Sequence, residues 1–115
     1  MTLRIQATTE DVWTIAPRGR LDLPAARAME DALNELCDAG RARVVVDLSE
    51  VVYVASAGLK ALLTGVRRAR LLNGDVRLTG MTDRVRDVFE MSGFDQVFAI
   101  HPSLQEAVQS FKQTG

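Results

Sequence analysis

The sequence has few of the residues that form disulfides and metal sites. Among its 115 residues there is one cysteine, Cys37, and one histidine, His101. A single cysteine cannot form an internal disulfide, and this pair offers no zinc-binding cluster. Such cysteine usage fits a reducing compartment, so we expect a cytoplasmic protein. We expect Cys37 to be a small buried or half-buried hydrophobic side chain on a helix.

The chain also lacks an excess of either charge and any long apolar run. Its 14 Lys+Arg nearly balance 15 Asp+Glu, which argues against nucleic acid or an anionic membrane surface as the main partner. The longest stretch without a charged residue, 96–105, is far shorter than the ~20 apolar residues of a membrane-spanning helix. The first residues alternate and carry charge, unlike a signal peptide. We therefore expect no membrane insertion and no export.

What is present is the composition of one small globular domain, which we expect to span residues 1–115. Apolar residues make up 47% of the chain and charged residues 25%, the usual balance for such a domain. A chain of this length buries roughly two-thirds of the surface that it exposes when unfolded. The core therefore needs neither metal nor disulfide.

In the first half of the chain, the hydrophobic pattern changes from a strand period to a helix period. Alternation over 3–8 and 12–16 predicts a hairpin, with Pro17 at an edge or a bulge because proline cannot donate to a ladder. From Asp22 to Gly40 the spacing is helical. Residues 44–48 form a β-branched run that is typical of a central parallel strand.

The second half alternates helices with strands. Helical spacing covers 56–73 and 82–92, strands are expected at 75–79 and 97–100, and a capping box at Ser103 opens a final helix. We expect an α/β fold: a mixed sheet of four to five strands that begins with a hairpin, flanked by about four helices, with parallel βαβ units in its second half.

The segment 47–59 is the most informative. It leads from a strand through a short apolar connection to Ser56 at the start of a helix, with small neighbours at Ala55, Ala57 and Gly58. A phosphate on this hydroxyl would meet the free N–H groups of the helix start. The helical spacing by itself favours the simpler interpretation that Ser56 is the N-cap, a position where serine is among the best residues.

Three elements then carry a family resemblance. Residues 19–22 read Gly-Arg-Leu-Asp, 55–60 read Ala-Ser-Ala-Gly-Leu-Lys, and 88–94 read Val-Phe-Glu-Met-Ser-Gly-Phe. In order and spacing they resemble the STAS domain family, which is shared by bacterial anti-sigma factor antagonists and sulfate transporters, and the likeness covers nearly the whole chain. The resemblance implies a STAS-like domain of the antagonist type.

The resemblance also implies a site and its partners. Ser56 would be phosphorylated by an anti-sigma factor that is also a serine kinase, and a phosphoserine phosphatase would reverse the modification. ATP and Mg²⁺ would belong to the kinase, so no cofactor is expected here. The implied partner contacts are Asp22, Ala55, Ser56, Ala57, Gly58 and Lys60.

Two positions depart from the family pattern, which has Asp where this chain has Ala55 and Gly where it has Lys60. Loss of the Asp removes a negative charge beside a phosphate worth about -1.5 to -2 at pH 7, and it also removes a possible contact for the kinase. Lys60 opposes the helix dipole by ~0.5 kcal/mol; it could recognise an acidic partner, steady a phosphate, or simply be solvated. The departures leave an alternative open: a non-phosphorylated STAS accessory subunit of a transporter or another assembly.

An enzyme is the weakest interpretation. Residues 54–58 partly match the G-x-S-x-G nucleophile elbow, but Val54 replaces the first glycine and only His101 could serve as the base. We expect His101 at the surface beside the last helix, without a third group to orient it. No phosphate-binding glycine motif is present. The sequence therefore predicts a binding protein without catalytic residues.

Overall fold

The structure is a computed structural model that describes residues 2–8 and 11–113. It confirms the α/β class, with a mixed sheet and four helices in the described ranges. The elements, in chain order, are β1 (Thr2–Ala7), β2 (Trp13–Leu21), α1 (Leu23–Asp38), β3 (Arg43–Asp47), β4 (Glu50–Val54), α2 (Ser56–Leu71), β5 (Asp75–Thr79), α3 (Asp83–Ser92), a 3-10 turn (Phe94–Gln96), β6 (Ile100–His101) and α4 (Leu104–Gln113).

The six strands form one sheet in the order β1-β2-β3-β5-β6, with β4 paired to β2. β1 and β2 are antiparallel, with Ile5 opposite Ile15, which confirms the hairpin. The other pairings are all parallel. β3 lies between β2 and β5, as its β-branched run predicted. Parallel neighbours require helical crossovers, which α1, α2 and α3 supply.

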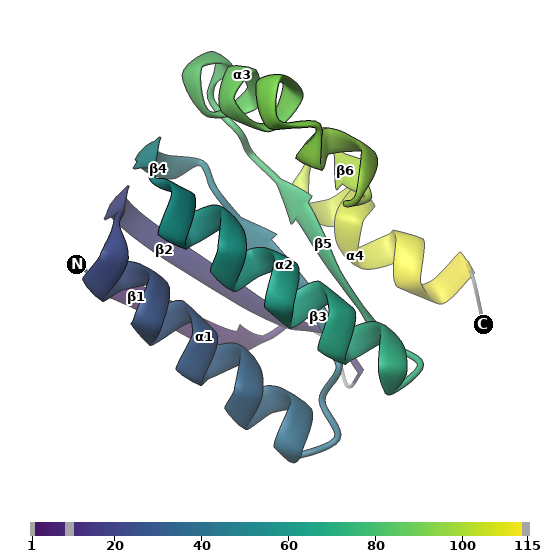
Figure 1. Ribbon diagram of the computed structural model, residues 1–115. Helices are drawn as coiled ribbons and strands as arrows, with labels where there is room; N and C mark the ends of the chain where they lie inside the picture. The colour runs from purple at the N-terminus through teal and green to yellow at the C-terminus, as the bar shows by residue number, and fades with distance from the viewer. Residues whose placement is uncertain (1, 9–10, 114–115) are drawn as a thin grey trace.

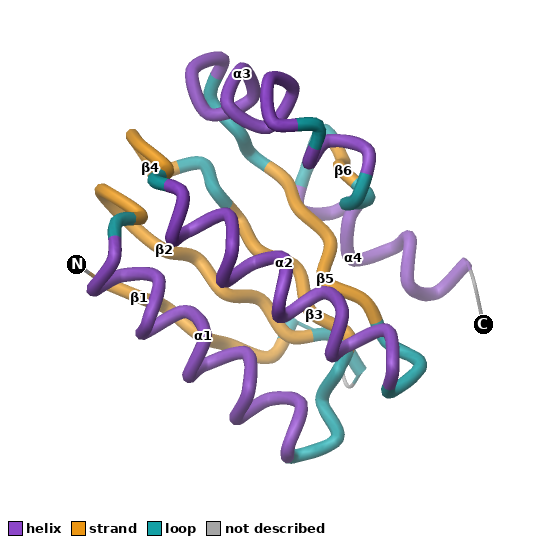
Figure 2. The backbone as a smooth tube through the Cα atoms, viewed as in Figure 1, coloured by secondary structure: helices purple, strands orange, loops and turns teal. Residues whose placement is uncertain are grey.

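Helices cover both faces of the sheet. Figure 1 shows α1 and α2 side by side across one face, and Figure 2 shows the strands passing beneath them. Val44 and Val46 enter the core on that side, whereas Val45 points the other way and packs with Val108 and Phe111 of α4. Burial on both faces explains why β3 is uniformly apolar.

β2 is longer than the sequence indicated. It continues past residue 16 to Leu21, so Pro17 lies inside a strand that is interior to the sheet, at a point where one side has no paired neighbour. On the side away from β1, β2 pairs with β3 only through Ile15 and with β4 only from Arg18. Pro17 therefore lies where the neighbouring strand changes, and its missing N–H interrupts no ladder on that side.

The expected apolar connection before Ser56 is itself a strand, β4, which brings the sheet to six strands. Gly19 pairs with Val51 and Arg20 pairs with Tyr53, so Val52 is an extra residue in β4. This irregularity interrupts the alternation that marks a half-buried strand. The last strand, expected at 97–100, is Ile100–His101 instead, because the 3-10 turn and the turn after it occupy residues 94–98. Within 2–8 and 11–113, no helix is long and apolar enough to cross a membrane.

Candidate functional site

Two parallel strands end side by side, and a helix follows each of them. Leu21 at the end of β2 pairs with Val54 at the end of β4. One residue further on, the backbone N–H of Ala55 donates a 3.0 Å hydrogen bond to the Leu21 carbonyl. Asp22 and Ser56 therefore lie at the same edge of the sheet, at the starts of α1 and α2. The structure thus places at one edge the two segments that the family resemblance implied as partner contacts.

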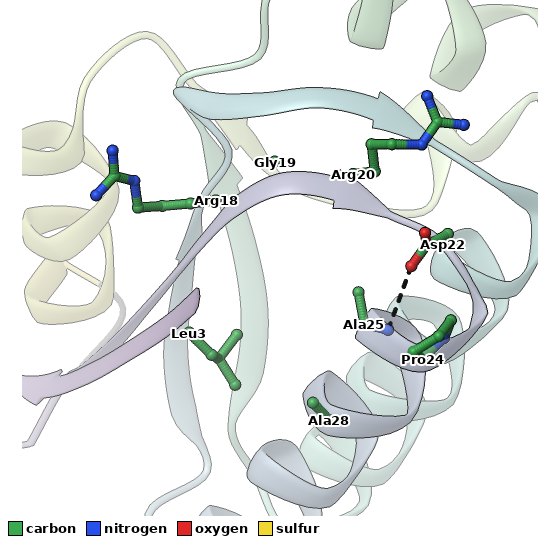
Figure 3. A pocket seen from close by; sticks show the side chains of 8 residues that line it. All are labelled: Leu3, Arg18, Gly19, Arg20, Asp22, Pro24, Ala25 and Ala28. Atoms are coloured by element: carbon green, nitrogen blue, oxygen red, sulfur yellow. Dashed lines mark hydrogen bonds between the residues drawn. The ribbon is translucent and has the colours of Figure 1, made fainter. Parts of the chain in front are cut away.

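Asp22 is the N-cap of α1. Its backbone is extended, with φ -96° and ψ -167°, and its carboxylate accepts a 3.5 Å hydrogen bond from the N–H of Ala25. Figure 3 shows this contact beside Pro24 in the first turn of the helix. The geometry satisfies one of the free N–H groups at the helix start. Asp22 therefore has a structural role, and its predicted contact with a partner remains a prediction.

Ser56 is the first residue of α2, so the expectation that it is the N-cap is wrong. Ala55 takes that position with an extended backbone, φ -85° and ψ 167°, and no side chain caps the helix there. The cause is tertiary, because the hydrogen bond to Leu21 holds Ala55 in line with the end of β4. Ser56 is exposed, whereas Ala55 and Ala57 are half-buried. Its hydroxyl is therefore accessible to another protein.

Gly58 allows α2 to start close to the end of β2. A Cβ at this position would lie 2.8 Å from both the Cγ and the carbonyl oxygen of Leu21. That separation is too short for a real carbon contact, so only glycine fits without movement of the backbone. Gly58 is buried, and in the structure it acts by positioning Ser56.

The surface around Ser56 has few carboxylates. Neither α1 nor α2 has an acidic residue in its first turn, and Asp22 already caps α1. Lys60 is exposed one turn after Ser56 and forms no ion pair with any residue that the structure describes. On β2, the guanidinium of Arg20 lies 4.4 Å from the centre of the Tyr53 ring. α2 itself contains no carboxylate, so all its charged side chains are cations.

Apolar side chains next to this edge were not singled out from the sequence. Leu23, directly after Asp22, is 54% exposed, and Val52 and Tyr53 in β4 are 58% and 40% exposed. Exposed apolar groups of this kind mark protein-binding surfaces when they lie together. The sequence shows only that each of these three positions holds an apolar residue, which does not predict that the side chain is exposed. Their exposure depends on the irregular pairing of β4 and on the position of Leu23 at the helix start.

A shallow hollow of about 570 Å³ lies beside the site, between β1, the end of β2 and the start of α1. Figure 3 shows that Arg18 and Arg20 extend away from each other on either side of Gly19. Arg18 pairs with Glu50 at 2.7 Å. In the described ranges, no group of three or more His, Cys, Asp and Glu side chains could hold a metal. The hollow is lined by Leu3, Arg18, Gly19, Arg20, Asp22, Pro24, Ala25 and Ala28.

His101 differs from the expectation of a surface residue. It is half-buried in β6, and its Nε2 is enclosed without a hydrogen-bond partner among the described residues. β3 and β5 lie between β6 and β2 in the sheet. The topology thus gives no support to His101 as a base for Ser56.

Comparisons with known proteins agree with this fold. Residues 6–106 match a family model described as "Mlab, STAS domain". A Bordetella bronchiseptica protein described as a candidate anti-sigma factor antagonist, BtrV, is 35% identical over 95 residues, covering 83% of this chain and 82% of that protein. A crystal structure of a Thermotoga maritima protein with a similar description has a TM-score of 0.87 at 18% identity, covering 94% of this chain and 92% of that one. The Bacillus cell fate determinant SpoIIAA, solved in its phosphorylated form, has a TM-score of 0.76 at 18% identity, covering 96% and 99%.

Proposed function

Because this chain belongs to the STAS domain family, we propose that it acts by binding, as an anti-sigma factor antagonist in the cytoplasm. The observation that carries the proposal is the exposed Ser56 at the start of α2, at the same sheet edge as Asp22, with exposed Leu23 and Tyr53 within three residues of these two positions along the chain. The similarity to BtrV supports it. This surface offers a hydroxyl, one carboxylate and apolar area within one edge of the sheet, which suits a protein partner better than a small substrate.

The proposed partner is an anti-sigma factor that is also a serine kinase. In its unphosphorylated form the chain binds this partner, and the sigma factor is thereby released. The kinase then transfers the γ-phosphoryl group of ATP to the Ser56 hydroxyl. A new P–O bond forms, ADP leaves with the electrons of the broken P–O bond, and a base of the kinase takes the serine proton. A phosphoserine phosphatase restores the hydroxyl by hydrolysis.

Phosphorylation acts through local charge. It adds about -1.5 to -2 charges at pH 7 to a surface that the bound partner covers. Burying such a group without a matching cation on the partner carries a desolvation cost of several kcal/mol. The modified chain therefore leaves the kinase. The phosphorylated form of SpoIIAA, a protein of the same fold, supports a switch of this kind.

The experiment is a kinase reaction followed by mass spectrometry. The chain is incubated with a candidate kinase-type anti-sigma factor from the same genome and with Mg·ATP, and then weighed intact and sequenced as peptides. We expect one phosphate, located on Ser56, and none on a Ser56→Ala variant. Phosphate on Ser49, Ser92 or Ser103 with none on Ser56 would contradict the proposed switch.

The two departures from the family pattern favour a second candidate function. Ala55 supplies no carboxylate beside the serine, and Lys60 replaces a glycine. A STAS subunit that docks permanently in a transporter or another assembly needs no modifiable serine. Tight binding to a partner without any phosphorylation would identify this function in place of the switch.

A further inference from the structure

Ser56 and Lys60 are one turn apart on the same helix. α2 runs without interruption from Ser56 to Leu71, and both side chains are exposed. Residues four apart on a helix are neighbours on its surface, with about 5–6 Å between their Cβ atoms. A lysine side chain easily spans that separation. Anything attached to the Ser56 hydroxyl therefore lies within reach of the Lys60 ammonium group.

No other group in the described ranges holds Lys60. It forms no ion pair there, and the first turn of α2 contains no acid that could compete for it. Asp22, which shares the sheet edge with Ser56, accepts a hydrogen bond from Ala25 in its own helix. Of the two cations on β2, Arg18 pairs with Glu50 and Arg20 lies over the Tyr53 ring.

We propose that Lys60 is the intramolecular counter-ion of a phosphate on Ser56. An acidic group four residues before a lysine is the favourable order for such a pair in a helix, and the phosphate carries more charge than a carboxylate. This inference rests on the proposed function for the origin of the phosphate. If the pair forms, phosphorylation changes two side chains at once: Ser56 gains a phosphate, and Lys60, now paired with that phosphate, is no longer available to an acidic group of a partner.

The test installs phosphoserine at position 56 during translation, so that no kinase is needed. The ³¹P chemical shift then gives the pH at which the phosphate passes from monoanion to dianion. A nearby cation favours the dianion, so we expect Lys60→Gln to raise this midpoint by about 0.3 pH units, from the usual strength of such a pair. Lys60→Arg keeps the charge and should keep the midpoint.

Arg67→Gln is the matched control. Arg67 is an exposed cation on the same helix. It lies about 16 Å from Ser56 along the helix axis, which is beyond the ~8–10 Å over which charges interact at physiological salt. Its removal should leave the midpoint unchanged. Salt at ~1 M should abolish the difference between wild type and Lys60→Gln.

Two results would overturn the inference: equal midpoints for wild type and Lys60→Gln at low salt, or an equal rise in Arg67→Gln. Neither measurement involves the kinase. If Ser56 proves not to be phosphorylated by the kinase, the proposed function fails while the pair can still be measured. If the pair fails, the kinase reaction still tests the proposed function.

Discussion

Gly58 packs against Leu21 so closely that a Cβ on Gly58 would lie 2.8 Å from the Leu21 carbonyl oxygen. That oxygen also accepts the hydrogen bond from the N–H of Ala55. A backbone hydrogen bond therefore holds the start of α2 to the end of β2, and Gly58 permits this close approach because it has no side chain. This relationship fixes where Ser56 lies relative to Asp22.

Gly58→Ala should lower the free energy of unfolding. The new methyl group meets a backbone oxygen that cannot rotate away, and overpacking of this kind costs about 1–3 kcal/mol, more than the ~1 kcal/mol that alanine gains over glycine in a helix. Urea unfolding measures the change. Thr64→Ala is the control, since Thr64 is exposed on the same helix and its replacement by alanine adds no close contact, so it should cost less. An equal or smaller loss in Gly58→Ala would contradict the proposed close approach.

Ala55→Asp should stabilise the protein and speed its phosphorylation. Ala55 is an N-cap whose side chain accepts no hydrogen bond, and replacing alanine by aspartate at such a position is worth about 0.5–2 kcal/mol. Repulsion between Asp and the incoming phosphate should contribute about 1 kcal/mol at most near solvent, less than the gain from better positioning of the serine. We therefore expect the phosphorylation rate to rise by about tenfold, the effect of ~1.4 kcal/mol on a barrier.

Thermal unfolding and a timed kinase assay check the two effects. Ala55→Asn is the control, because it caps the helix without adding charge. If Asn stabilises as much as Asp but only Asp speeds phosphorylation, the carboxylate itself assists the kinase. A rate for Ala55→Asp no higher than that of wild type would mean that the departure from the family pattern is neutral.

Ser56→Asp should weaken kinase binding without weakening the fold. The carboxylate lies at the first position of α2, where the helix dipole favours an acid, so the free energy of unfolding should change by less than ~1 kcal/mol. In the complex, the carboxylate of the variant replaces the serine hydroxyl at the proposed contact with the partner. We expect an affinity loss of at least about tenfold, or ~1.4 kcal/mol, by calorimetry.

Gln109→Asp provides the comparison for that variant, since Gln109 is exposed on α4, which packs on the other face of the sheet from α2. It adds the same charge away from the proposed contact surface. Equal affinities for Ser56→Asp and wild type would place the partner surface elsewhere on the molecule.

Cys37 should make stability fall at alkaline pH. The thiol is buried in α1, and desolvation raises its pKa, although the charge of Arg68 acts in the opposite direction. As the pH rises above the ordinary thiol value of ~8.5, the unfolded chain loses its proton first. The contribution of the thiol to stability is therefore complete below that pH and is lost as the pH rises through the folded-state pKa.

Urea unfolding between pH ~7 and ~10 measures this slope, with Cys37→Ala as the variant that lacks the thiol. We expect wild type to lose more stability over this range than Cys37→Ala. A thiol reagent should modify the native protein slowly, at a rate that increases with urea. Parallel stability profiles for the two proteins would show that burial of Cys37 has no effect on its titration.

The sequence by itself determined those helices and strands whose own capping residues and hydrophobic pattern match the burial that the fold gives them. α1 follows from Pro24 in the first turn and apolar residues at helical spacing, and the structure adds Asp22 as its cap. β3 follows from its β-branched run, because a strand buried on both faces needs no alternation. α4 follows from its cap, since Ser103 accepts a 3.1 Å hydrogen bond from the N–H of Glu106. In each case one segment contains the whole signal.

Only the tertiary structure decided the form of the site. β4 is a strand because Arg18–Leu21 of β2 offers it an edge, and the extra residue Val52 hid the alternation in the sequence. Ser56 lies inside α2, one residue beyond the N-cap, because the carbonyl of Leu21 holds Ala55 extended. Asp22 and Ser56 share an edge because their strands are parallel and in register. Each of these features depends on hydrogen bonds between segments far apart in the chain, which no local pattern of residues encodes.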